Sequence, residues 1–182
     1  MRIPSTRRVR AILAVGPLVA LSWAGAFSAF TDNVTATSGF STGTVVIRAN
    51  DQLGTAAFTS LSMSGITPGA VSYAALRVSN GGSNDFSYTM ATATTGSATL
   101  AAALTIGIKV VPSATCAATD YNASSTTVYA EAAGLGSAAV ASRPLASGVS
   151  EFLCFKVQLP SSASNTLQGL TTNATFSFTA SA

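Results

Sequence analysis

Histidine is absent from this 182-residue sequence, and only 8% of its residues are charged. Without an imidazole the chain cannot form an HExxH zinc site, a Ser/His/Asp triad or a Cys/His dyad. Carboxylate chemistry is the remaining route, but the six acids are dispersed, and most lie where turns are expected. They are Asp32, Asp51, Asp85, Asp120, Glu131 and Glu151. We therefore expect no catalytic activity, no cofactor and no metal site.

The first 28 residues have the layout of a signal peptide for export. Four arginines among the first ten residues precede a stretch from Ala11 to Thr31 that has no charge. Small residues at the recognition positions allow cleavage after Ala26 or after Ser28. The apolar run also nearly reaches the length that spans a bilayer, so a retained anchor is the alternative. The sequence thus predicts a secreted protein, extracellular or associated with the cell wall or cell surface, which meets the membrane only through its leader before signal peptidase removes it.

Removal of the leader changes the charge of the chain. Four of the nine basic residues leave with residues 1–28, so the mature chain has five basic and six acidic residues and a net charge of −1. The remaining basic residues are scattered along the sequence, and we expect no nucleic-acid partner. They are Arg48, Arg77, Lys109, Arg143 and Lys156. Because so few charges provide little repulsion between copies, association of the protein with itself is open.

The chain has two cysteines, Cys116 and Cys154. In an oxidising compartment two cysteines favour a disulfide, with two buried free thiols as the alternative. The stretch EFLCFKVQLP alternates, so Cys154 lies on the opposite face from Leu153 and Phe155. A disulfide would therefore connect the PSATCAATDY loop to the outer side of a strand.

Short stretches typical of β-strands, separated by turn residues, make up the mature sequence. In LTIGIKV, for example, the residues from Leu104 to Val110 alternate between one apolar and one polar face. Two stretches, LGSAAVAS and SASNTLQ, could form one or two helical turns each, and Asn80-Gly81-Gly82-Ser83 is expected to connect two strands tightly. We predict one all-β domain over residues 44–182, a jelly-roll-like antiparallel β-sandwich with one or two short helices. The predicted strands span 44–49, 56–63, 71–80, 86–92, 100–111, 126–132, 151–159 and 174–180.

Several stretches together resemble the TasA/camelysin family of exported bacterial proteins with SipW-type signal peptides. They are AFSAFTD, GFSTGTVVIRAND, LSMSGITPGAVSYAALRVSNGGSNDFSYTM and LPSSASNTLQGLTTNATFSFTA. The resemblance implies a jelly-roll subunit of extracellular fibres in a biofilm matrix, in which the N-terminal segment of one subunit completes the sheet of its neighbour. Camelysins are also classed as metallopeptidases, but no histidine supports that activity in this chain.

Applied to this sequence, the resemblance implies cleavage between Ser28 and Ala29. Residues 29–43 would then comprise a donor segment to about residue 40 and a turn, with Phe30, Val34 and Phe40 as apolar anchors. The expected partners are other copies of the same chain, with room for an accessory matrix or anchoring protein. The paired cysteines and the scarcity of lysine depart from the lysine-rich members of the family.

A second hypothesis is a monomeric cell-surface adhesion or glycan-binding module. Its candidate contacts are four tyrosines that would stack on sugars if they lined one face of the sandwich. They are Tyr73, Tyr88, Tyr121 and Tyr129.

Overall fold

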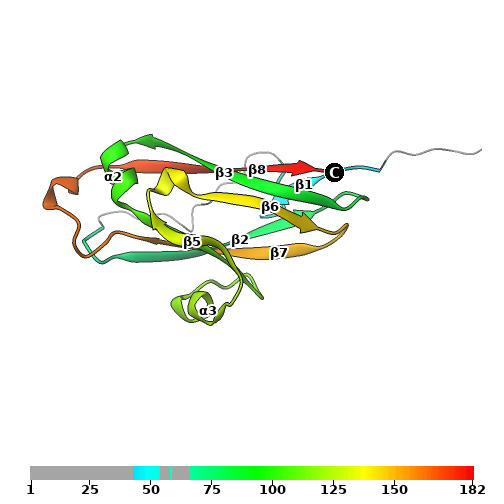
Figure 1. The fold of residues 1–182 in the computed structure, drawn as a ribbon, viewed down its shortest axis with the longest axis horizontal. Helices are drawn as coiled ribbons and strands as arrows, with labels where there is room; N and C mark the ends of the chain where they lie inside the picture. The colour runs from blue at the N-terminus through cyan, green and yellow to red at the C-terminus, as the bar shows by residue number, and fades with distance from the viewer. Residues whose placement is uncertain (1–42, 54–57, 59–65) are drawn as a thin grey trace, which may run out of the picture. The chain divides into compact units, whose positions relative to one another are not determined.

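The computed structural model describes residues 43–53, 58 and 66–182, and it shows an all-β sandwich of two antiparallel sheets with two short helices (Figure 1). Sheet A has the order β1-β2-β7-β4-β5, and sheet B has the order β6-β3-β8. The strands of sheet A are β1 (Ile47–Ala49), β2 (Val71–Asn80), β7 (Ser150–Gln158), β4 (Thr105–Val111) and β5 (Thr127–Ala133). Those of sheet B are β6 (Ala139–Leu145), β3 (Phe86–Gly96) and β8 (Thr172–Ser181).

The strand pairing is that of a jelly roll in three of its four nested pairs. Folding eight strands into a jelly roll pairs the second with the seventh, the third with the sixth, the fourth with the fifth and the first with the last. This chain pairs β2 with β7, β3 with β6 and β4 with β5. The first strand departs from the pattern, because β1 lies near β8 but pairs with β2 instead. The position beside β8 in sheet B is therefore not taken by β1.

The core lies between the two sheets and follows the alternation of the sequence. Ile106 and Ile108 of β4 and Leu153 and Phe155 of β7 are each fully buried, as the sequence predicts. Sheet B contributes the buried side chains of Tyr88, Met90 and Val140 to the same cluster. The prediction of an antiparallel β-sandwich is thus confirmed.

The short helices are partly where the sequence predicts strands. Residues 98–103 form α2 (Ala98–Ala103), capped by the Ser97 hydroxyl, so the strand predicted over residues 100–111 begins only at Thr105. Alanine and leucine are strong helix formers, and this local preference prevails where no neighbouring strand pairs with the segment. A second helix, α3 (Ala118–Ala123), lies in the loop that carries Cys116.

Both predicted helical turns are present, each as a single 3-10 turn. The 3-10 turn η3 (Asn165–Leu167) begins at Ser164, whose hydroxyl accepts a hydrogen bond from the Thr166 amide at 3.2 Å. In LGSAAVAS only the 3-10 turn η2 (Leu135–Ser137) is helical, and the rest enters β6. Pairing with β3 decides the outcome there, because β6 gains backbone hydrogen bonds and buries Val140.

The Asn80-Gly81-Gly82-Ser83 segment joins two strands but not as a hairpin. It runs from β2 in sheet A to β3 in sheet B, and so crosses from one sheet to the other. The side chain of Asn80 holds the crossing in place. Its Nδ2 donates to the backbone carbonyl oxygens of Asn84 and Leu145, and its Oδ1 accepts a hydrogen bond from the backbone amide of Gly82. A Cβ on Gly82 would lie 2.1 Å from the Thr44 carbonyl oxygen, so this backbone approach requires glycine.

Candidate functional site

Within the described part of the chain the sandwich has four edge strands, and they differ in how well they are protected against pairing with another chain. Natural sheets blunt their edges with short strands, bulges, proline or charged residues. In sheet A, β1 has three residues and β5 has irregular register and an exposed Glu131. In sheet B, β6 contains Arg143, Pro144 and a bulge opposite Tyr88 and Met90. These three edges have the devices that discourage strand addition.

The fourth edge, β8, has none of these devices. Its ten residues pair with β3 without a shift of register, from Thr172 opposite Gly96 to Ser181 opposite Ser87. The strand reads TNATFSFTAS and contains no proline, glycine or charged residue. Among the described residues β8 is paired on one side only, so a row of backbone donors and acceptors on its other side is open to a further strand. We take this edge, the β8 edge, as the candidate functional site.

The inward side chains of β8 are apolar but incompletely covered. Ala174, Phe176, Phe178 and Ala180 pack against the core yet remain half-buried, whereas Tyr88 and Met90 of the adjacent β3 are buried. The ring of Phe176 lies 4.9 Å from that of Phe155, and the ring of Phe178 lies 6.0 Å from that of Tyr88. A strand added beside β8 would bury the remaining apolar surface of these rings, which is favourable by about 25 cal/mol per Å².

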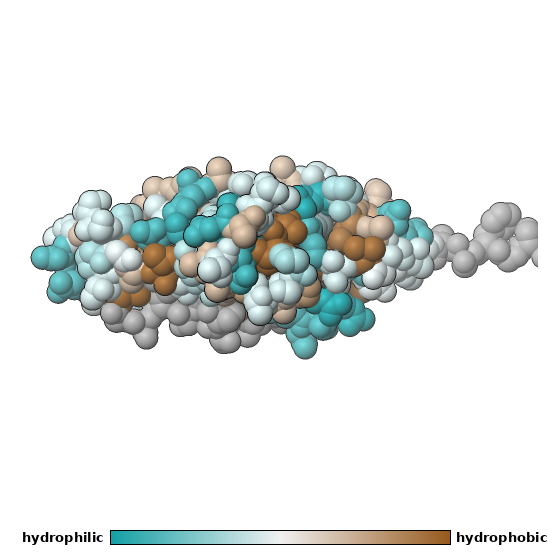
Figure 2. Space-filling view, turned by 90° about the horizontal axis from the view of Figure 1, so that it is seen from below, coloured by the Kyte–Doolittle hydropathy of each residue, from teal (hydrophilic) through white to brown (hydrophobic). Residues whose placement is uncertain are grey.

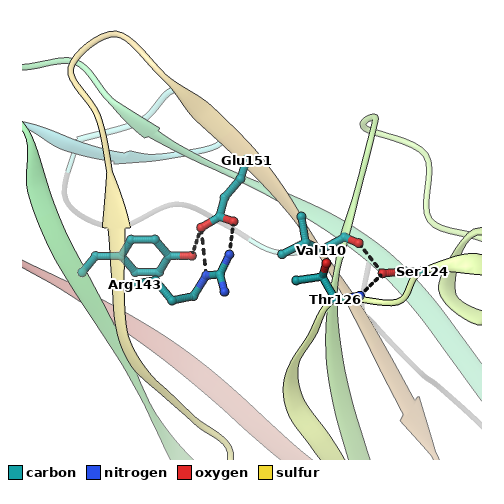
Figure 3. Close-up of polar contacts among 6 residues, drawn as sticks. Val110, Ser124, Thr126, Arg143 and Glu151 are labelled. Atoms are coloured by element: carbon teal, nitrogen blue, oxygen red, sulfur yellow. Dashed lines mark hydrogen bonds and ion pairs between the residues drawn. The ribbon is translucent and has the colours of Figure 1, made fainter.

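A polar cluster connects the two sheets near the β6–β7 turn. Glu151 of β7 accepts hydrogen bonds from Arg143 of β6, at 3.1 Å from Nε and 2.6 Å from Nη2, and from the hydroxyl of Tyr88 (Figure 3). The bulge in the β3–β6 pair allows both Val140 and Arg143 to face inward, although two residues lie between them instead of one. Burial, strengthened by the bond to Glu151, raises the pKa of Tyr88, and the same carboxylate raises the pKa of Arg143. This cluster satisfies its own charges and has a structural role.

On the outer face of sheet A, a disulfide holds the loop that contains α3. Cys116 in the loop is bonded to Cys154 of β7, with the Cα atoms 5.5 Å apart, as the sequence predicts. Cys154 faces away from the core but is fully buried, because the loop covers it. Tyr121 of α3 lies over Gly107 of β4, where a Cβ would meet the tyrosine hydroxyl at 2.2 Å. The hydroxyl of Ser124 donates a hydrogen bond to the carbonyl oxygen of Val110 at 2.5 Å, which holds the end of the loop (Figure 3).

The same face gathers four basic residues that are far apart in the sequence. By strand register Arg48, Arg77, Lys109 and Lys156 all point outward from sheet A. Arg77 pairs with Asp51 at 2.9 Å and Lys156 with Glu131 at 2.8 Å. Figure 2, seen from the side of α3, shows apolar patches separated by polar residues on this side. The sequence did not predict this clustering, because the four residues are far apart along the chain. The alternation around Lys109 and Lys156 does place these two side chains on the polar faces of their strands.

The acids and tyrosines singled out from the sequence do not form a common site in the described part of the chain. Asp85 accepts from the Ser147 amide and Asp120 from the Ala117 amide, while the other three described acids are in the ion pairs above. Tyr88 and Tyr121 are buried, and Lys109 lies 4.9 Å from the Tyr121 ring centre. Burial, with smaller effects from Glu131 and Tyr73, raises the pKa of Tyr121. Tyr73 lies beside Tyr121, with ring centres 5.9 Å apart, whereas Tyr88 and Tyr129 pack against the core, so the four tyrosines do not line one face of the sandwich.

The residues predicted to direct export and assembly lie outside the described residues. These are Ser28 and Ala29 at the cleavage site and Phe30, Val34 and Phe40 in the donor segment. Within residues 43–53, 58 and 66–182 there is no cluster of three side chains suited to a metal ion, and no helix there is long and apolar enough to cross a membrane. No protein-family model matches the sequence, and no curated protein matches it.

Proposed function

We propose that this protein is an exported structural subunit of extracellular fibres, and that it assembles when the N-terminal segment of one copy adds as a strand to the β8 edge of the next. The observation that carries the proposal is the β8 edge itself: ten residues long, uncharged and paired on one side only among the described residues. Strand addition to such an edge gains affinity from backbone hydrogen bonds and specificity from alternate side chains.

The donor segment has the length and pattern that this edge requires. Residues 29–40 would extend over about 40 Å, against about 34 Å for the ten residues of β8. An extended chain places the even-numbered residues on one face; these are Phe30, Asp32, Val34, Ala36, Ser38 and Phe40, and four of the six are apolar. That face would cover the half-buried Phe176 and Phe178 rings. The jelly-roll pattern supports the same place, because the position beside β8 is the one that β1 leaves open.

The resemblance to the TasA/camelysin family supports the proposal from the sequence side. It rests on short motifs along most of the chain, among them LQG and FSFTA at the C-terminal end. The FSFTA motif falls within β8, at the edge proposed to accept the donor. The proposal therefore places one of the most specific motifs at the assembly contact.

The test separates donor from acceptor in two variants of the mature protein that begins at Ala29. Deletion of residues 29–40 removes the donor, and Ala180→Lys places an inward charge on the β8 edge, a device by which natural edges resist pairing. Each variant should remain folded by circular dichroism but form no fibres in electron micrographs, whereas the wild type forms them. Ala130→Lys, exposed on β5 of sheet A, is the matched control and should form fibres as the wild type does.

Mixing the two variants sharpens the test. The deletion variant keeps an acceptor and the Ala180→Lys variant keeps a donor, so together they should form a one-to-one heterodimer that grows no further. Sedimentation velocity measures this species. Wild-type protein that stays monomeric under all conditions, with residues 29–40 dispensable, would overturn the proposal.

A further inference from the structure

The residues just before β1 are bound to the segment that crosses from β2 to β3. The amide of Thr44 donates to the hydroxyl of Ser83 at 2.9 Å, and the Ser83 amide donates to the carbonyl oxygen of Thr44 at 3.0 Å. The Gly81 amide donates to the carbonyl oxygen of Val46 at 2.8 Å, and β1 continues the pairing along β2. The two segments of this unit, which we call the N-terminal anchor, are residues 43–46 and 80–84.

Two glycines allow the segments of the anchor to approach closely. A Cβ on Gly82 would lie 2.1 Å from the Thr44 carbonyl oxygen, and a Cβ on Gly43 would overlap the side-chain amide of Asn84. On its other side, the carbonyl oxygen of Gly82 accepts a hydrogen bond from the Ser147 hydroxyl at 2.8 Å. The crossing segment therefore cannot move away from Thr44 without loss of its bond to the β6–β7 turn.

The anchor lies at the C-terminal end of β8. Gly43 lies against Asn84, and Ser87, three residues further along, pairs with Ser181 of β8. Figure 1 shows the cyan start of the described chain beside the C-terminus. The chain that precedes Gly43 is therefore joined to the domain at the C-terminal end of the β8 edge.

Chain length limits which β8 edge the donor segment can reach. A strand that adds antiparallel along the whole of β8 ends at the N-terminal end of β8, about 34 Å from the anchor. From residue 40, where the donor segment ends, to Gly43 the chain spans at most about 11 Å. While the anchor holds, a complete antiparallel addition is therefore possible only on another copy.

Parallel addition to the same copy is within reach of this short linker, but it is the weaker arrangement. Parallel strands pair slightly less stably per residue than antiparallel strands. All strand pairs among the described residues are antiparallel, and so is the pair of first and last strands in a jelly roll. The antiparallel addition to another copy is thus the favoured one.

Given the strand addition proposed above, on which this step rests, we propose that the N-terminal anchor directs the donor segment to a second copy by preventing antiparallel addition to its own β8 edge. Without the anchor, only the three residues of β1 hold this part of the chain to β2. Once they separate, residues 41–49 span roughly 30 Å, nearly the length of β8. The donor segment then meets its own edge at a millimolar effective concentration, and a closed monomer competes with the fibre.

The test releases the anchor by the addition of one methyl group. Gly82→Ala places a Cβ against the backbone of Thr44, which cannot turn aside. Gly81→Ala is the matched control, because its Cβ would lie 2.9 Å from Nε of the flexible Arg48 side chain. Neither glycine has a positive φ, so alanine brings no backbone strain of its own at either position.

Hydrogen exchange measures the anchor itself. The background is the mature full chain with Ala180→Lys, in which strand addition is blocked and the donor segment is present. Exchange of the Ser83 amide should be at least about tenfold faster in Gly82→Ala and less than about threefold faster in Gly81→Ala. Circular dichroism checks that both variants are folded.

Fibre growth measures the choice of acceptor, in the mature chain with Ala180 in place. At about 10 μM protein, Gly82→Ala should elongate at least about tenfold more slowly than the wild type, and Gly81→Ala at the wild-type rate. Ser83→Ala removes the acceptor of the Thr44 amide without steric overlap, and it should slow elongation in the same direction by less.

The results separate this inference from the proposed function. Unchanged exchange of the Ser83 amide in Gly82→Ala would overturn the anchor, and normal elongation of a chain whose anchor is released would overturn its role in the choice of acceptor. A wild type that forms no fibres would overturn the proposed function and that role together, whereas the exchange measurement would still decide whether the anchor holds residues 43–46.

Discussion

Sheet A and sheet B share one core but differ in what covers their outer faces and edges. The outer face of sheet A is covered by a loop of its own chain, held by the Cys116–Cys154 disulfide and by Tyr121 over Gly107. Among the described residues, sheet B has neither a loop nor a charge on its outer face, and its β8 edge is paired on one side only. Sheet A is thus completed by intramolecular contacts, and we infer that sheet B leaves its contacts to other copies.

The largest effect should come from removing the disulfide, because the loop over the outer face of sheet A is then no longer bonded to β7. The bond joins residues 38 positions apart, and a loop of that length predicts a loss of about 4 kcal/mol in the free energy of unfolding when both cysteines become alanine. Calorimetry should show Tm lower by roughly 10 °C. Ala139→Ser on sheet B should change the stability by less than about 0.5 kcal/mol.

The same variant also separates folding from assembly. Below its Tm the Cys116→Ala, Cys154→Ala variant should still elongate, because the β8 edge and the donor segment are untouched. A loss of elongation in a chain that remains folded would show that the sheet A loop takes part in assembly, and the division between the two sheets would be wrong.

The next effect concerns the cluster that joins the two sheets. Glu151→Gln removes the charge that Arg143 pairs with, and the side chains of both residues are mostly buried, 13% and 27% exposed. We expect a loss of about 2–3 kcal/mol, somewhat below the cost of breaking a fully buried pair. Urea unfolding at neutral pH measures it. Glu131→Gln, which breaks the more exposed pair with Lys156, is the matched control and should cost under about 1 kcal/mol.

The strands with strict alternation were predictable from the sequence, because burial of one face forces a period of two. The alternation in residues 104–110 and 153–159 predicted which side chains face the core and that Cys154 points outward, and the structure confirms both. Two cysteines in a chain that the sequence predicts to be exported were enough to predict the disulfide. These features depend on local pattern, which a single sequence contains.

Features that depend on pairing between distant strands were not predictable. The strand β6 was not predicted, because its stretch is rich in alanine and serine. The helix α2 formed where the beginning of a strand was predicted. The Asn80 segment was expected to connect two strands tightly, but it crosses between the sheets because β2 pairs with β7 and not with β3. The sequence likewise did not predict that β8 is an edge strand, because the position of a strand at an edge depends on the order of the whole sheet.

The smallest effect is an alkaline one and tests the buried side of sheet B. Burial and Glu151 raise the pKa of Tyr88 above its ordinary value of 10.0, so the folded state disfavours the phenolate. Below pH 10 the residue is neutral in both states. Above pH 10 the unfolded chain ionises while the folded chain does not, so stability falls with rising pH by up to about 1.4 kcal/mol per unit.

Tyr88→Phe should remove most of this alkaline dependence, although it costs some stability at neutral pH by withdrawing a donor from Glu151. Urea unfolding at pH 8, 10 and 11 gives the slope for each protein. Tyr121 also has a raised pKa but lies under the sheet A loop, so Tyr121→Phe should remove a smaller part of the slope. Equal slopes in the wild type and Tyr88→Phe would mean that the hydroxyl between the sheets is not held as the structure shows, and that the tyrosine burial on sheet B is no deeper than on sheet A.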